Sequence, residues 1–172
     1  MNRFQKLLAA AGATLALAGA AHADTTWKFE YAGANGVYVT GSFATPGDGS
    51  TPTTVEWLTG TYTDPSVTNA ALSLIPTTST PYGTNEFLSA DGQYYYNNQF
   101  NTSTGFDDGG LLFNAGSLEV NLYGSNGGFI SLTNGTQTSV SFMAVPVPEP
   151  TSVAMLLAGL GALGFASRRK RA

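Results

Sequence analysis

The 172-residue chain contains no cysteine, a single histidine and very few basic residues between its two ends. Without cysteine the chain has no disulfides, no thiol catalysis and no thiolate metal sites. The one histidine, His22, lies in a segment that we expect to be removed on export. The mature chain would then have no imidazole, which argues against histidine-based catalysis and zinc chemistry.

Positive charge is also scarce, because Lys28 is the only basic residue between positions 24 and 146. Ten carboxylates stand in the same region: Asp24, Glu30, Asp48, Glu56, Asp64, Glu86, Asp91, Asp107, Asp108 and Glu119. Ten negative charges and one positive charge leave this region at about −9 near neutral pH. Such an acidic region argues against nucleic acid as a partner.

Residues 1–23 have the three parts of a secretory signal peptide in the expected order. Arg3 and Lys6 form a charged start, and residues 7–19 form an uncharged apolar run. At the predicted cleavage site, the small residues Ala21 and Ala23 precede the polar residue Asp24. We therefore expect signal peptidase to cut before Asp24; an uncleaved N-terminal anchor is the alternative.

The other end has the features of a second address signal, over residues 147–172. It begins with the extended motif Val147, Pro148, Glu149, Pro150 and Thr151. An apolar stretch over 152–167 predicts a short transmembrane helix. The basic cluster that follows predicts a cytoplasmic stop, formed by Arg168, Arg169, Lys170 and Arg171. Prolines on both sides of the glutamate favour an extended backbone that a membrane enzyme could bind without unfolding it.

This arrangement resembles the PEP-CTERM sorting signal, a tail also labelled an ice-binding protein C-terminal domain. The resemblance implies a substrate of an exosortase, an integral-membrane enzyme of Gram-negative bacteria that make extracellular polysaccharide. It further implies a single-pass intermediate in the inner membrane, followed by delivery to the cell surface or the extracellular matrix. A permanent C-terminal membrane anchor is the alternative interpretation.

The central region, 24–146, has hydrophobic residues at a period of two, which predicts β-strands. Trp27, Phe29 and Tyr31 alternate with Lys28 and Glu30, so the aromatic residues would share one face. Other alternating sets involve Val37, Val39 and Phe43, then Val55 and Trp57. Further strands are expected at 72–75, 93–96, 111–113, 118–123, 129–133 and 138–143, with a tight hairpin turn at Asn134-Gly135. We expect eight or nine strands in an all-β antiparallel sandwich or jelly roll, with a barrel as the alternative.

Two segments of this region are candidates for ligand binding. Tyr94, Tyr95 and Tyr96 could stack on sugar rings, although alternation would place at least one of them in the core. Asp107 and Asp108 precede two glycines and could hold calcium, the only cofactor considered; a solvated β-turn is the competing interpretation.

Catalysis and ice binding have weaker support from the sequence. A glycosidase would need a carboxylate pair drawn from Glu56, Asp64, Glu86, Asp91 and Glu119. Threonine rows suit an ice-binding surface, but threonine is also favoured on the solvent face of strands; the rows are Thr59, Thr61 and Thr63, and then Thr136 with Thr138. We therefore expect a non-enzymatic, exported β-domain with no resident metal or other cofactor, which associates with exopolysaccharide.

Overall fold

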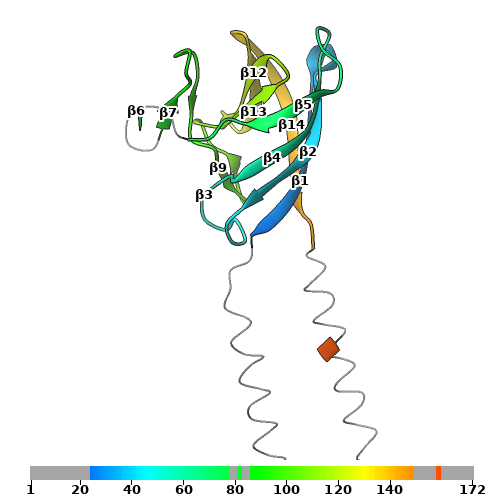
Figure 1. The fold of residues 1–172 in the computed structure, drawn as a ribbon, viewed down its shortest axis with the longest axis vertical. Coiled ribbons are helices and arrows are strands. Elements are labelled where there is room, and N and C mark those ends of the chain that lie inside the picture. Colours follow the sequence, from blue (N-terminus) through cyan, green and yellow to red (C-terminus); the bar gives the residue numbers. More distant parts are fainter. Residues whose placement is uncertain (1–23, 78–80, 83–85, 149–157, 160–172) are drawn as a thin grey trace, which may run out of the picture.

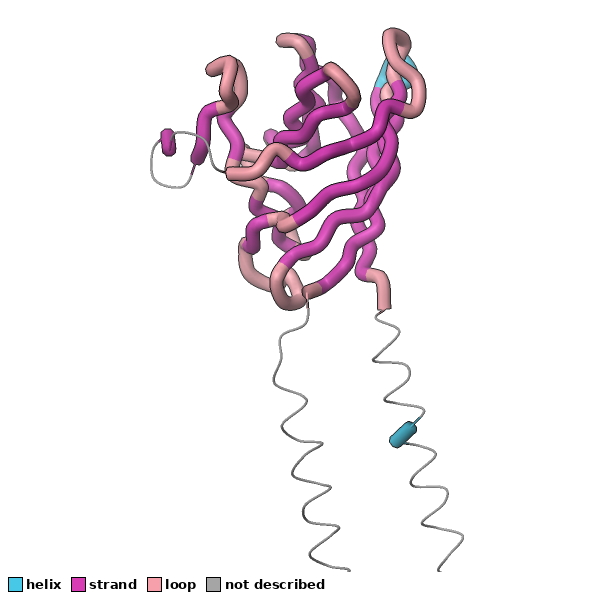
Figure 2. The backbone as a smooth tube through the Cα atoms, viewed as in Figure 1, coloured by secondary structure: helices cyan, strands magenta, loops and turns pink. Residues whose placement is uncertain are grey.

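The computed structural model describes residues 24–77, 81–82, 86–148 and 158–159 (Figure 1). The regular structure of the barrel region is almost all β-strand, with turns and loops between the strands (Figure 2). Its strands are β1 (Thr25–Gly33), β2 (Tyr38–Thr45), β3 (Thr53–Thr54), β4 (Trp57–Thr63), β5 (Ala70–Leu74), β6 (Pro81–Tyr82), β7 (Glu86–Leu88), β8 (Tyr95–Tyr96), β9 (Gln99–Asn101), β10 (Gly105–Phe106), β11 (Leu111–Ala115), β12 (Leu118–Ser125), β13 (Gly128–Thr133) and β14 (Thr136–Pro146). A short 3₁₀ turn, η2 (Ala34–Gly36), joins β1 to β2. The predicted all-β class is confirmed.

The main sheet is a closed barrel with the strand order β1-β14-β13-β12-β11-β5-β4-β2. All eight pairings are antiparallel, and β1 closes the sheet by pairing with both β14 and β2. The predicted sandwich or jelly roll is therefore wrong, and the barrel, our alternative, is the observed architecture. Closure pairs the first strand with the last, so neither is left at a fully open sheet edge.

The strands β1 and β2 form because their large apolar residues fall on the inner face of the barrel. Trp27, Phe29 and Tyr31 are each no more than 4% exposed, while Lys28 and Glu30 point outward. Val39 and Phe43 of β2 are fully buried. The predicted alternation is thus confirmed for these two strands.

Two glycines let the paired strands β2 and β4 lie against the aromatic core without side chains between them. Gly41 and Gly60 are directly opposite each other, and the Phe29 ring lies over this point. A Cβ added at Gly60 would lie 2.3 Å from the Thr40 carbonyl oxygen, and the φ angle of Gly60 is 151°. No other residue type fits at Gly60 without moving the backbone.

The barrel has two different ends, which we call the base and the mouth. At the base, β1 begins and β14 ends, with Trp27 opposite Pro146 and the Val147 N–H donating to the Thr26 carbonyl at 2.8 Å. The two chain ends therefore leave the barrel side by side (Figure 1). The mouth is the opposite end, where η2, the loop after β4 and the β13–β14 turn meet. The predicted Asn134-Gly135 turn is confirmed, because both residues have positive φ angles, 48° and 75°.

Two small sheets lie against the barrel, in the orders β10-β9-β3 and β6-β7-β8. The first brings Phe100 and Phe106 into the main core at the base; Phe43 lies 4.9 Å from Phe100 and 5.7 Å from Phe106, measured between ring centroids. The second helps to cover a separate small core of Tyr94, Tyr96 and Leu112.

Several expectations concern residues outside the described ranges. These are the signal peptide with Ala21 and Ala23, the motif residues Glu149, Pro150 and Thr151, and the basic cluster 168–171. The expected helix at 152–167 is described only at Ala158 and Gly159, which are helical. Within the described ranges, no helix has the length and apolar character needed to cross a membrane.

Candidate functional site

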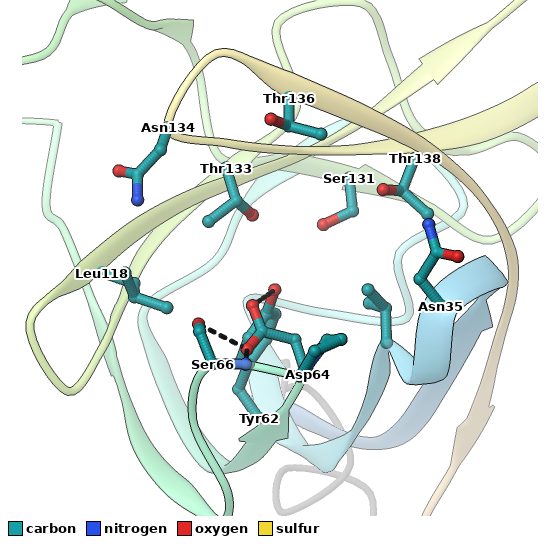
Figure 3. Close-up of a pocket in the computed structure, with 12 residues that line it drawn as sticks. Asn35, Tyr62, Asp64, Ser66, Leu118, Ser131, Thr133, Asn134, Thr136 and Thr138 are labelled. Carbon is teal, nitrogen blue, oxygen red and sulfur yellow. Dashed lines mark hydrogen bonds between the residues drawn. The ribbon is translucent and has the colours of Figure 1, made fainter.

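A cavity of about 280 Å³ opens at the mouth of the barrel (Figure 3). Its walls come from the β1–β2 connection, the end of β4 with the loop that follows, and the β13–β14 hairpin. Six of the twelve lining residues carry hydroxyl groups: Tyr62, Ser66, Ser131, Thr133, Thr136 and Thr138. Because alternate residues of a strand share a face, the spacing of Ser131 and Thr133 turns both into the cavity.

Asp64 supplies a carboxylate to this cavity, at the point where the chain leaves β4. Its Oδ1 atom accepts hydrogen bonds from the backbone N–H groups of Ser66 and Val67, at 2.7 and 2.9 Å, and from the Ser66 hydroxyl at 2.7 Å. Its Oδ2 atom accepts one from the Tyr62 hydroxyl at 3.1 Å. Desolvation is the largest single influence and raises the pKa of Asp64, but these hydrogen bonds together outweigh it and lower the pKa below its ordinary value.

Two tyrosines are linked to the cavity: Tyr62 lines it, and Tyr31 is buried beneath it, next to the lining residue Ser131. The Tyr31 hydroxyl, inside the barrel, lies 3.4 Å from the Ser131 hydroxyl. Burial raises the pKa of Tyr31 strongly, and burial also raises the pKa of Tyr62. Both phenols therefore remain neutral at physiological pH and act as hydrogen-bond donors and acceptors.

The mouth thus offers many hydroxyls, the Asn35 and Asn134 side chains and one ionised carboxylate. This set of groups suits an uncharged polar ligand with several hydroxyls of its own. Among the sequence-derived candidates only Asp64 and the Thr136–Thr138 row belong to the cavity. The other residues that line the cavity were not predicted from the sequence, because they come together only when distant strands close the barrel.

The three candidate tyrosines do not form a continuous platform. Tyr94 and Tyr96 are 3% and 0% exposed and belong to the small core. Tyr94 also receives a hydrogen bond from the Asn134 N–H at 3.0 Å, and Tyr96 donates to the Pro76 carbonyl at 2.9 Å. Only Tyr95 is exposed, at 46%. Two of the three rings are therefore occupied by packing.

Asp107 binds groups of its own chain. Its carboxylate accepts two contacts from the Asn97 amide nitrogen, at 2.9 and 2.8 Å, and its Oδ1 atom accepts the N–H groups of Gly109 and Gly110. This is the hydrogen-bonding pattern of a turn held by an aspartate side chain. The neighbouring Asp108 is exposed. In the part of the chain that the structure describes, no group of three or more potential metal ligands is present.

Of the five candidate catalytic carboxylates, Asp91 and Glu119 interact with each other. Burial raises the pKa of Glu119, and the negative charge of Asp91 raises it further. The Ser89 hydroxyl donates its proton to Asp91 at 2.5 Å. Neither carboxylate lines the mouth cavity.

The threonines of the β4 row do not line the mouth cavity. Thr59 is exposed, and Thr61 lies opposite Thr40 of β2. These residues occupy the solvent side of two neighbouring strands, where threonine is common.

The C-terminal motif starts directly at the base. Its first residue, Val147, donates a hydrogen bond to Thr26 of β1, directly after the last ladder pair of β14, and Pro148 follows. Residues 146–171 match the family model of the PEP-CTERM protein-sorting motif. No curated protein and no solved structure matches the chain.

A closed barrel followed at once by this motif defines an exported domain with a C-terminal sorting tail. The chain carries the PEP-CTERM protein-sorting motif at residues 146–171. The motif marks it for exosortase-dependent sorting to the bacterial cell surface. The expected family resemblance is confirmed.

Proposed function

We propose that this protein is a non-enzymatic surface domain that binds extracellular polysaccharide in the mouth of its barrel. In this proposal, signal peptidase removes residues 1–23, and the tail holds the chain in the inner membrane of a Gram-negative cell. The exosortase then removes the tail, and the barrel joins the cell surface or the extracellular matrix. No metal or other cofactor takes part.

The observation that carries the proposal is the position and chemistry of the mouth cavity. It lies at the end of the barrel opposite the base, where β14 ends at Pro146, so a chain held at its C-terminal end presents the cavity away from the point where it is held (Figure 1). Its hydroxyl and amide groups can exchange hydrogen bonds with sugar hydroxyls. The surplus of carboxylates, ten against one lysine, favours a neutral polysaccharide over a polyanion.

Binding can be tested with the mature protein and polysaccharide purified from its host. Thr133→Val removes one mouth hydroxyl at nearly constant shape, and Thr59→Val makes the same change on the outer wall. We expect retardation of the wild-type protein in gels that contain the polysaccharide. The Thr133 variant should bind several times more weakly, because one lost hydrogen bond is worth about 0.5–1.5 kcal/mol. Equal retardation of both variants, or none for the wild type, would contradict a mouth site.

A carbohydrate-active enzyme is the second candidate, and the Asp91–Glu119 pair is the observation in its favour. A carboxyl group whose pKa is raised beside a second carboxylate is the arrangement that glycosidases use. Release of reducing ends from the host polysaccharide, abolished by Glu119→Gln, would replace the binding proposal with this one. We expect no release.

Removal of the tail is tested by intact-mass measurement of the protein from its native host. We expect a mature chain that begins at Asp24 and ends near Pro148. Replacing Pro148 and Pro150 with alanine should make the unprocessed chain accumulate in the inner membrane, because the motif loses its fixed extended shape. A wild-type surface protein that still carries Arg168 to Ala172 would instead support a permanent anchor.

A further inference from the structure

The last strand of the barrel is paired along only part of one side. β14 pairs with β13 from Thr136 to Val140, where Phe129 is the last partner. On its other side, β14 pairs with β1 as far as Pro146. Within the described ranges, residues 141–146 therefore have a strand neighbour on the β1 side alone.

The register shows which backbone groups lie on the unpaired side. Val147 donates to Thr26, and in an antiparallel ladder hydrogen-bonded pairs alternate with pairs that are not bonded. Ser141, Met143 and Val145 therefore direct their N–H and C=O groups toward β1. Phe142 and Ala144 direct theirs away from β1, to the side without a strand.

This free edge borders a groove of about 290 Å³. The groove lies between β14 and the β9–β10 hairpin, and its lining includes Phe129, Phe142, Ala144 and Thr104. Beside it, two of the outward side chains of β14 are apolar and exposed: Met143 is 54% exposed and Val145 is 47% exposed. The edge therefore combines unpaired backbone groups with exposed apolar side chains.

Natural proteins usually protect such an edge with charges, a proline or a covering segment. Here Pro146, which has no N–H, ends the edge at the base, but the five residues 141–145 carry no charge and no proline. Uncharged strand segments with high β-propensity are ready templates for another strand.

We propose that this edge pairs with the same edge of a second copy, as an antiparallel β14–β14 contact about a twofold axis at Met143. In that register Phe142 exchanges two hydrogen bonds with Ala144 of the second copy, and the symmetric pair adds two more. Met143 lies opposite its own copy, and Ser141 lies opposite Val145.

The second copy fits this edge because the edge is self-complementary. Pairing centred on Met143 ends with Ser141 opposite Val145. The next pair would join Pro146 to Val140, and the N–H and C=O groups of Val140 already face β13. The free segment is thus symmetric about its own centre. No like charges meet within it, although the acidic barrels as a whole repel each other at low salt.

Cysteine cross-linking tests the contact, because the chain has no cysteine of its own. Met143→Cys places one sulfur at the twofold axis, where opposing Cα atoms would be about 4.5 Å apart, within the range of a disulfide. Thr40→Cys, equally outward-facing on β2, is the control. In the mature, tail-free protein under mild oxidation, we expect at least about tenfold more disulfide dimer from the Met143 variant. Equal dimer from both variants would overturn the proposal.

A register test and an edge-blocking variant complete the experiment. Ser141→Cys mixed with Val145→Cys should give the mixed dimer in preference to either self-dimer. Ala144→Pro removes an N–H that points away from β1, so it should abolish dimers in sedimentation measurements and leave the melting temperature nearly unchanged. A wild-type protein that is monomeric at high salt, where repulsion is screened, would contradict the contact.

Discussion

The base and the mouth of this barrel are built from the same strands, yet opposite kinds of side chain fill them. At the base, Trp27, Phe43 and Phe100 pack with ring centroids about 5–6 Å apart. At the mouth, the inward positions are occupied by hydroxyls and a carboxylate around a cavity of 280 Å³. The difference indicates that the base supplies stability and that the mouth is free to supply binding.

The largest expected effect is at the base. Phe43→Ala removes a fully buried ring in contact with four other aromatic rings, and it should lower the free energy of unfolding by about 3–5 kcal/mol. Thr133→Val at the mouth should change it by less than about 1 kcal/mol. Urea denaturation of both variants is the measurement. Comparable losses would show that the two ends do not divide these roles.

A substitution at the Gly41–Gly60 pair, between the base and the mouth, should give the next largest loss of stability. Gly60→Ala forces a Cβ against the Thr40 carbonyl and should cost about 1–3 kcal/mol, as overpacked sites do. Gly127→Ala changes a turn glycine with open space around it and is the control for steric crowding. If Gly60→Ala were no worse than Gly127→Ala, close packing of β2 and β4 would not be required.

Alkaline pH should lower the free energy of unfolding through Tyr31, which lies between the core and the mouth. The pKa of Tyr31 is raised by burial, so above pH 10 the unfolded chain loses this proton first and stability falls as pH rises. One pH unit above the ordinary tyrosine value, the loss should be about 1.4 kcal/mol for this residue. Denaturation at pH 8 and pH 11 measures it. In Tyr31→Phe the Tyr31 share of the loss should be absent; an undiminished slope would assign the effect elsewhere.

Acid should have the smallest effect, at the mouth. The pKa of Asp64 is lowered, so its hydrogen bonds add stability above the unfolded value of about 3.8, and this is lost as pH falls through the lower folded value. Because the carboxylate is largely solvated, we expect less than about 1 kcal/mol. Asp64→Asn should flatten the dependence between pH 5 and pH 2. An unaltered profile would mean that other carboxylates cause it.

Local pattern was enough to predict most of the long strands of the barrel, but it did not predict their closure or the short strands of the two small sheets; of the expected strand 93–96, only Tyr95–Tyr96 is a strand. The inward set of β1 and the Asn134-Gly135 turn depend on neighbours in the sequence, and both are confirmed. The barrel depends on pairs such as Trp27 with Pro146, which no local period encodes. A sandwich and a barrel share the same alternation, so the sequence pattern could not separate them.

Val55 and Trp57 show where alternation itself misleads. We expected them on one face, but Val55 is 2% exposed and Trp57 is 41% exposed. Val55 bonds to the Asn98 carbonyl, while Glu56 bonds to that of Ala44, so the chain changes strand partners between them. A period of two holds only along one continuous ladder.

Candidate sites were predicted less well than strands. Tyr94 and Tyr96 have the composition of a sugar platform, but packing around Leu112 buries them. Ser131, Thr133 and Tyr62 come together only because β4 and β13 face each other across the closed barrel. The tail, in contrast, is readable because its signal is contiguous in the sequence.

The hydrogen bond from Val147 to Thr26 has a mechanical consequence. A pull between the C-terminal end of β14 at the base and a polymer held at the mouth runs along the length of β14. That load shears the β1–β14 hydrogen bonds together, whereas a pull between the two chain ends would unzip them one at a time. A mature chain attached through its C-terminal end and bound to the proposed polysaccharide at its mouth would therefore resist tension best in the direction in which it is stretched.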